Sequence, residues 1–238
     1  MPETGTGTEA FRAARARVLE RIEVAATRAR RDPAAVTLVA VSKTVPVERL
    51  RSAVEAGIDV LGENRVQEAE AKVGALGLAR WHLVGKLQSN KARRAVELFD
   101  VVESVDSVAL AGRLDRVAGE LRPGRRLDVL VQVNVDADPS KAGFEEADVA
   151  DALGEILELP NLDVRGLMTV GRLAGSAEEA RTTFRSLRSL SEQLRAAHAG
   201  LGRELSMGMS HDFEIAIEQG ATIVRIGQAL FGPRPHHH

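Results

Sequence analysis

Short apolar segments alternate with longer amphipathic segments along almost the whole chain, and this alternation restricts the fold more than any other feature. The clearest apolar segment, 127–135, reads LDVLVQVNV and is rich in β-branched residues, as expected of a strand buried on both faces. The clearest amphipathic segment, 177–197, places Ala180, Phe184 and Leu187 on one helical face. Strands are predicted at 36–41, 59–61, 80–84, 101–104, 127–135, 162–167, 205–207 and 222–226.

Helices are predicted between successive strands, at 47–56, 66–76, 89–99, 108–121, 147–157, 177–197 and 211–219. An additional helix precedes the first strand, because Phe11, Ala14, Val18, Ile22 and Ala25 recur at spacings of three and four. Strict alternation of strand and helix implies a parallel sheet. In a chain of 238 residues, eight units favour an α/β fold closed into a (β/α)₈ TIM barrel, which usually takes about 250 residues.

The sequence predicts one domain with short extensions. The small polar residues of 1–9 are typical of a disordered tail, and 10–235 forms the barrel. The three histidines at 236–238 resemble the remnant of a purification tag.

Composition excludes several classes of partner. The charged residues nearly balance, at a net charge of −2, so we expect no nucleic-acid partner, which usually requires a basic excess. We expect no membrane partner, because no apolar run is long enough to span a bilayer and no leader pattern opens the chain. Cysteine is absent, which excludes disulfides and thiolate metal sites and fits a cytoplasmic location.

Polar residues and glycines follow seven of the eight predicted strands. In TIM barrels the loops after the strands build the active site. Lys43 follows the first strand, so its amine is expected in a partly desolvated barrel mouth. Desolvation lowers a lysine pKa, and the neutral amine is the form that attacks an aldehyde. A surface lysine at a strand end is the alternative interpretation.

A phosphate site is predicted after the last two strands. Ser210 and Gly208 precede a predicted helix, while Gly227 and Gln228 open the last helical turn. Backbone N–H groups at such positions bind anions, and glycine allows close approach. The alternative is that Ser210 is only a helix N-cap.

Two other polar residues lie within predicted strands. Arg225 ends a buried strand, so it either pairs with a carboxylate or faces a ligand, since an unpaired charge there is costly. His82 lies beside Trp81, and taken alone it is more readily a core histidine than a catalyst. The histidines lack metal-ligand spacing, so no metal is expected.

Long ordered motifs between about residues 10 and 234 add to this interpretation. They are AVSKTVP at 40–46, GENRVQEA at 62–69, WHLVGKLQSNK at 81–91, QVNVD at 132–136, SKAGF at 140–144, RGLMTV at 165–170, LSMGMSHDFEIAI at 205–217 and VRIGQALFG at 224–232. With these motifs the chain resembles the pyridoxal phosphate homeostasis proteins, whose barrel is like the N-terminal domain of alanine racemase.

The resemblance implies that Lys43 holds pyridoxal 5′-phosphate as a Schiff base, the internal aldimine. It places the phosphate among Ser210, Gly227 and Gln228, and Arg225 beside the pyridine nitrogen. It also places Asn64 and Met168 against the cofactor, with His82 included in the predicted site. Family members usually carry a small hydroxyl residue where this chain has Gln228, so only the backbone N–H remains as a phosphate contact there.

Two functions compete. The first is a cofactor-binding protein without a committed reaction, which keeps pyridoxal phosphate available and delivers it to apo-enzymes. The second is an amino-acid racemase, and a third, weaker hypothesis is an aldolase that uses Lys43 without this cofactor. Racemases of this type take a second base, a tyrosine, from an additional β domain, whereas this chain contains no tyrosine. We therefore favour the first, as a monomer or weak dimer.

Overall fold

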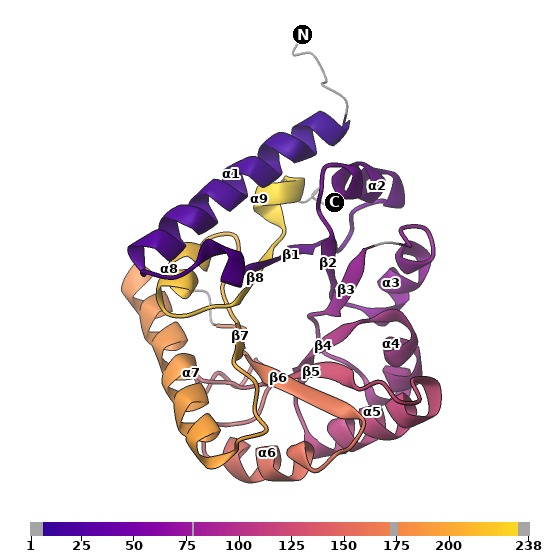
Figure 1. Cartoon of the computed structure of the whole chain (residues 1–238), viewed down its shortest axis with the longest axis vertical. Helices are drawn as coiled ribbons and strands as arrows, with labels where there is room; N and C mark the ends of the chain where they lie inside the picture. The colour runs from indigo at the N-terminus through magenta and orange to yellow at the C-terminus, as the bar shows by residue number, and fades with distance from the viewer. Residues whose placement is uncertain (1–6, 78, 172–175, 233–238) are drawn as a thin grey trace.

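Eight parallel strands close into a barrel in the order of the sequence, with helices around the outside (Figure 1). The structure, a computed structural model, describes residues 7–77, 79–171 and 176–232. The strands are β1 (Thr37–Val41), β2 (Val60–Glu63), β3 (Arg80–Leu83), β4 (Val101–Val105), β5 (Leu127–Gln132), β6 (Leu162–Met168), β7 (Glu204–Ser206) and β8 (Ile223–Ile226). The pairing of β1 with β8 closes the barrel, which confirms the predicted fold.

The helices occupy the predicted intervals. They are α1 (Gly7–Arg28), α2 (Val47–Glu55), α3 (Val66–Val73), α4 (Ala92–Leu98), α5 (Val108–Leu121), α6 (Val149–Leu157), α7 (Ala177–Ala197), α8 (Phe213–Glu218) and α9 (Gln228–Phe231), with 3₁₀ turns η1 (Pro33–Ala35) and η2 (Ser89–Lys91). The first turn of the helix predicted at 89–99 is therefore 3₁₀. The strand predicted to reach residue 135 ends at Gln132, because Val133 and Asn134 turn into the connection to α6.

Two apolar layers hold the barrel. The outer core lies between strands and helices and includes Leu61, Leu83 and Leu167, all fully buried. A smaller cluster forms a separate core, made of Val39, Val84, Leu130, Met168 and Ile223. Side chains in a parallel barrel alternate between these two layers. The strand segments are therefore apolar almost throughout, which makes them recognisable in the sequence.

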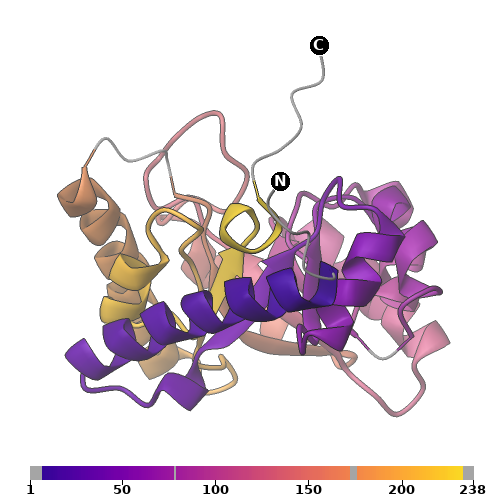
Figure 2. The same cartoon turned by 90° about the horizontal axis from the view of Figure 1, so that it is seen from above.

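Helix α1 lies against the outside of the barrel and packs on α2, α8 and α9 (Figure 2). Its predicted apolar stripe is buried, from Phe11 at 5% exposure to Ala25 at 1%. Arg21 adds a bidentate contact to Glu214, because its Nε donates at 2.8 Å and its NH2 group donates at 2.9 Å, and its guanidinium also lies 4.4 Å from the Phe213 ring centre. The extra helix thus covers the seam where β8 meets β1.

The first helix begins before residue 10, the predicted start of the barrel domain. Helix α1 begins at Gly7, so residues 7–9 are helical rather than part of a tail. Glu9 lies in the first turn, where a carboxylate interacts favourably with the helix dipole. The rest of the predicted tail, and the predicted tag remnant at 236–238, lie outside the described residues.

Candidate functional site

The predicted site residues come from strands whose ends meet at one rim of the barrel. Lys43 and Asn64 follow β1 and β2, which pair directly. Ser210 and Gly227 follow β7 and β8, which also pair. Because β8 pairs with β1, the four loops form a continuous arc around the carboxyl end of the barrel.

Lys43 is half-buried and lies in a tight turn at the end of β1. The turn is closed by the Val45 N–H, which donates to the Ser42 carbonyl at 3.0 Å. The residue after Lys43, Thr44, has a φ of +64°, a left-handed conformation that is uncommon for a threonine. Strain of this kind persists only where surrounding contacts enforce it, and it concentrates at functional sites.

A second lysine supports this turn from within the protein. The Lys72 ammonium, on α3, donates to the Ser42 carbonyl at 2.9 Å and to Glu63 Oε1 at 2.6 Å. The Ser42 hydroxyl donates to the same carboxylate at 2.7 Å. Glu63 is fully buried and Lys72 is 7% exposed. The Lys72–Glu63 ion pair therefore holds Ser42 and Glu63, the residues immediately before Lys43 and Asn64.

This ion pair was not predicted from the sequence. Burial raises the pKa of Glu63, and the contacts from Lys72 and Ser42 oppose that shift. A signal for it does exist in the sequence: Lys72 falls on the stripe of α3 that buries Val66 and Ala69. A charged residue on an apolar stripe requires a partner.

The loops after β7 and β8 meet. His211 Nε2 and Gln228 Oε1 are 3.1 Å apart, which links the Ser210 turn to the start of α9. At Gly227 an added Cβ would lie 3.3 Å from the Val41 carbonyl, so the chain passes close to the end of β1. The predicted phosphate residues are thus near one another and near the Lys43 turn.

The helix predicted to begin at His211 begins at Phe213. Asp212 is its N-cap, so the alternative interpretation of Ser210 as an N-cap is wrong. Gly208 has a φ of +91°, and a Cβ there would lie 2.5 Å from Ala216 Cβ. The glycine is therefore required by its backbone conformation and by packing against α8.

Arg225 lies in the barrel wall at 5% exposure. Its NH1 group donates to the Ser206 hydroxyl at 2.6 Å and its NH2 group donates to the Thr169 carbonyl at 2.7 Å. NH1 also lies 4.0 Å from Glu103 Oε2. These two hydrogen bonds use two of the five N–H donors of a guanidinium. Arg225 was expected either to pair with a carboxylate or to face a ligand, and the carboxylate, Glu103, is present. The remaining N–H donors of Arg225 can still face a ligand.

His82 is 3% exposed, and its Nδ1 lies 2.6 Å from Glu103 Oε1. Since a carboxylate only accepts, Nδ1 is the donor. The other ring nitrogen, Nε2, is buried without a hydrogen-bond partner among the described atoms. A buried polar atom left unpaired costs about 1–3 kcal/mol, so it indicates either a missing ligand group or a missing water.

A cavity of about 440 Å³ opens among the loops after β2, β3, β5 and β6. Its lining includes Asn64, Lys86, Gln132, Lys141 and Val170. The volume lies in the range typical of small-molecule sites. Of the predicted residues, Asn64 lines this cavity, whereas Met168 is fully buried in the smaller core.

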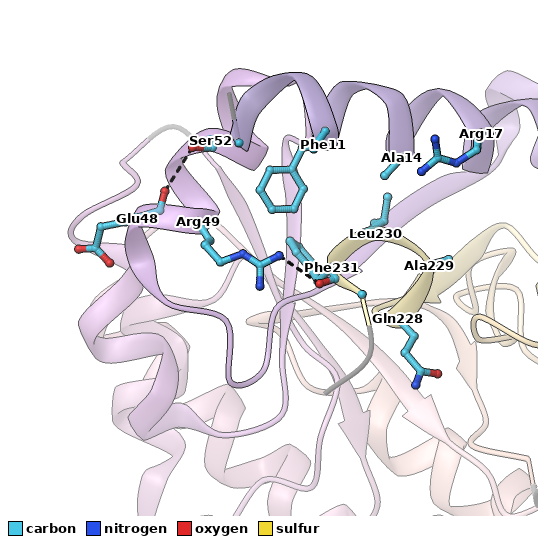
Figure 3. Close-up of a pocket in the computed structure, with 13 residues that line it drawn as sticks. Phe11, Ala14, Arg17, Glu48, Arg49, Ser52, Gln228, Ala229, Leu230 and Phe231 are labelled. Carbon is cyan, nitrogen blue, oxygen red and sulfur yellow. Dashed lines mark hydrogen bonds between the residues drawn. The ribbon is translucent and has the colours of Figure 1, made fainter. Parts of the chain in front are cut away.

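A larger cavity of about 540 Å³ lies between α1, α2 and α9. Phe11 and Phe231 meet edge to face there at 5.7 Å, and Arg49 donates to the Phe231 carbonyl at 3.2 Å (Figure 3). Gln228 lines it, but its side chain points away from Phe11 and Arg49 (Figure 3). We interpret this cavity as a gap in the packing of α1 against α2 and α9, since the loops of the predicted site lie at the barrel mouth.

Gly85 lets two loops of the site approach each other. A Cβ at Gly85 would lie 2.3 Å from the Asn64 carbonyl oxygen. We expect Gly85→Ala to lower the free energy of unfolding by about 1–3 kcal/mol, the usual cost of overpacking, and to weaken ligand binding by displacing Asn64. Urea unfolding measures the first effect. The matched control is Gly112→Ala in α5, where a Cβ meets nothing within 4 Å and stability should rise by about 0.5–1 kcal/mol. Equal stability of Gly85→Ala and the unsubstituted protein would contradict the prediction.

Sequence comparison assigns the chain to a family. A profile of the alanine racemase N-terminal domain matches residues 15–235. The pyridoxal phosphate homeostasis protein of Aquifex aeolicus is 42% identical over 222 residues, covering 92% of this chain and 96% of that protein. The chain belongs to the pyridoxal phosphate homeostasis protein family. The family members of Escherichia coli and Pseudomonas aeruginosa are 40% and 45% identical, each covering 93% of this chain, and 95% and 94% of their own lengths.

Solved structures agree with this family membership. PipY of Synechococcus elongatus, solved with pyridoxal phosphate bound, is 45% identical with a TM-score of 0.79, covering 90% of this chain and 100% of its own. The same protein without the cofactor gives 46% identity and a TM-score of 0.80, at 90% and 99% coverage. Alanine racemase of Clostridium difficile is 17% identical with a TM-score of 0.70, covering 92% of this chain and 60% of its own, and shares the fold.

The residue types at the candidate site suit the cofactor. Lys43 is half-buried, Arg225 is buried, and His82 Nε2 is buried without a hydrogen-bond partner among the described residues. Across the described residues, no three His, Asp or Glu side chains gather as a metal site would require. In the same ranges, no helix has the length and apolarity that a bilayer crossing needs.

Proposed function

We propose that the protein binds pyridoxal 5′-phosphate through a Schiff base on Lys43 and serves intracellular homeostasis of that cofactor. The observation that carries this proposal is the 45% identity to PipY, a protein solved with pyridoxal phosphate bound, over 90% of the chain. The family relatives named for pyridoxal phosphate homeostasis support the cellular role. The cofactor supplies an aldehyde and an electron-withdrawing ring, and the chain supplies the lysine and the site around it.

The chain's own residues have distinct roles in this proposal. Lys43 provides the amine, and the Lys72–Glu63 pair holds its turn. The Arg225 guanidinium lies beside the ring nitrogen, and its permanent charge disfavours protonation of that nitrogen. Asn64, Met168 and His82 would line the cofactor site, and of these Met168 and His82 are buried.

The phosphate is bound by backbone N–H groups at Gly227 and Gln228 together with the Ser210 hydroxyl. The contact between His211 and Gln228 supports this arrangement, because it holds the β7 and β8 loops together. The side-chain oxygen of Gln228 is engaged by His211 there, in agreement with a backbone-only role of Gln228 toward phosphate.

Ser210→Ala is expected to lower cofactor retention, because a hydrogen bond to a charged group such as phosphate contributes about 1.5–3 kcal/mol. A loss of this size corresponds to a roughly 10- to 160-fold rise in the dissociation constant at 25 °C. Equilibrium dialysis against free pyridoxal phosphate measures it. Unchanged retention in Ser210→Ala would place the phosphate elsewhere.

A carrier without a committed reaction agrees better with the chain than a racemase does. A ring nitrogen kept unprotonated is a weak electron sink, so carbanion chemistry is muted. The chain contains no tyrosine and matches 60% of the length of the C. difficile racemase. An ordinary enzymatic rate of alanine racemisation by the purified protein would overturn the carrier assignment in favour of the alternative.

The direct test is a spectrum of the protein as isolated, followed by borohydride reduction and peptide mapping. A visible band that becomes a stable adduct on Lys43 supports the proposal, and an adduct on another lysine contradicts it. Incubation with an apo-enzyme that requires the cofactor then tests delivery. We further propose a cytoplasmic monomer or weak dimer with one barrel domain that includes α1 from Gly7 onward. Within the ranges described, the exposed large apolar residues are Val24 and Met209, too few to form a broad interface.

A further inference from the structure

Glu103 is a fully buried carboxylate near the middle of β4. Its Oε1 accepts from His82 Nδ1 at 2.6 Å, and its Oε2 accepts from the Ser206 hydroxyl at 2.5 Å. The Ser206 oxygen in turn accepts from Arg225 NH1 at 2.6 Å. A chain of three hydrogen bonds therefore joins an imidazole, a carboxylate, a hydroxyl and a guanidinium.

These contacts cross the inside of the barrel. Glu103 is on β4, whereas Ser206 and Arg225 are on β7 and β8, which are not neighbours of β4 in the closed sheet. A side chain that reaches across must point inward. The register between β4 and β5 shifts between Val102 and Val105, and a bulge of this kind redirects side chains. Both of those valines belong to the outer core, so the shift leaves Glu103 directed into the barrel.

The cost of this arrangement indicates a function. An apolar cluster of similar volume is usually as stable as a buried ion pair, or more stable. Here the ion pair lies in the wall of a barrel whose smaller core is otherwise apolar. Among the described residues, the His82 nitrogen that does not face Glu103 is buried without a hydrogen-bond partner. Both oxygens of Glu103 accept hydrogen bonds, whereas His82 Nε2 has no such partner in the described part of the chain. This asymmetry indicates that the network serves a bound group.

We propose that Glu103 is a positioning residue for the cofactor: through Ser206 it orients Arg225, and its negative charge offsets the positive charge of that guanidinium. This inference rests on the proposed function. Arg225 touches the cofactor, whereas Glu103 acts through Arg225 and His82. Without Glu103 the site would present an uncompensated cation to the ring and to the Lys43 nitrogen.

The surrounding charges keep Glu103 ionised. Burial alone would raise its pKa, but His82, Arg225 and Ser206 together bring the pKa of Glu103 below its usual value. The groups that face it are His82 from β3, Ser206 from β7 and Arg225 from β8, and Asp212 acts on Arg225 from the turn before α8. Burial lowers the pKa of Arg225, and Glu103 and Asp212 oppose that shift.

The test is the pH titration of the visible band of the holoprotein, with and without Glu103→Gln. Glutamine keeps the size of the side chain and removes its charge. Removing a negative charge destabilises nearby protonated groups, so the midpoint should fall. The expected shift is about one pH unit, of the size that the loss of one buried unit charge produces at an effective dielectric constant of about 20. Glu204→Gln is the matched control, since Glu204 begins β7 at the opposite rim and accepts from Thr222; its midpoint should stay unchanged.

The outcomes separate this inference from the proposed function. A wild-type protein without a visible band or an adduct on Lys43 would sink the proposed function itself. A normal wild-type band with the same midpoint and retention in Glu103→Gln would overturn the role of Glu103 alone. If Glu103→Gln does not fold, Ser206→Ala decides. That variant keeps both charges, and it should lose the cofactor several-fold faster on dialysis, with little change of midpoint. Unchanged loss would overturn the inference.

Discussion

Lys43→Ala is expected to lose the visible band and the borohydride-stable adduct completely, while the barrel remains folded. The reason is chemical, because a Schiff base requires a primary amine and alanine offers none. Stability should change little, since the Lys43 side chain is half-buried and the turn is held by Ser42, Glu63 and Lys72. Absorbance after gel filtration, with peptide mapping after reduction, measures the loss.

Two further variants make that result specific. Lys43→Arg keeps a positive charge at the strand end but does not form the Schiff base, so it separates covalent from electrostatic binding. Lys91→Ala removes a lysine from η2, the 3₁₀ turn between β3 and α4 that contains no fully buried residue, and should keep the full band. A band that persists in Lys43→Ala, or that disappears equally in Lys91→Ala, would refute the assignment of the Schiff base to Lys43.

Most of the fold was predictable because each element carries its own periodic signal. The helices at 108–121 and 177–197 were predicted with both ends correct, since each has a long apolar stripe and a serine cap whose side chain accepts a backbone N–H. Predicted strand and helix ends were wrong where local sequence patterns compete. Residues 133–135 look like strand, yet Asn134 starts a loop that folds back so that its N–H donates to the Phe144 carbonyl at 2.9 Å.

The site was only half predictable, for a geometric reason. Lys43, Asn64 and Gly227 directly follow strands, so a rule about strand ends finds them. Glu103 lies within a strand, and its partners on β3, β7 and β8 are identified only once the barrel is closed and the β4 register has shifted. The single charge in the buried segment VVESV was the available signal.

The second large effect concerns the ion pair behind the Lys43 turn. Lys72→Met is expected to lower the free energy of unfolding by about 3–5 kcal/mol, the usual cost of leaving a buried charge unpaired. Methionine preserves most of the volume, and Glu63 then keeps the hydrogen bond from the Ser42 hydroxyl but loses its cationic partner. Urea unfolding of cofactor-free protein measures the change without a contribution from ligand binding.

The loss should depend on pH in a direction that identifies Glu63. Burial already raises the pKa of Glu63 in the folded protein, and removing Lys72 raises it further. A carboxyl group with a raised folded pKa is compatible with folding at low pH, and it costs stability as pH rises through that pKa, by at most about 1.4 kcal/mol per pH unit. The deficit of Lys72→Met should therefore be smaller at pH 5 than at pH 8.

Adding Glu63→Gln to Lys72→Met should recover much of the lost stability at pH 8 and remove its extra pH dependence, because no orphan charge remains. Cofactor affinity should recover less, since the Ser42 carbonyl still lacks the ammonium donor that fixes the Lys43 turn. A double variant that regains stability and full affinity together would show that the pair serves folding alone. Recovery of stability without affinity would show that the same buried charges also position the lysine that carries the cofactor.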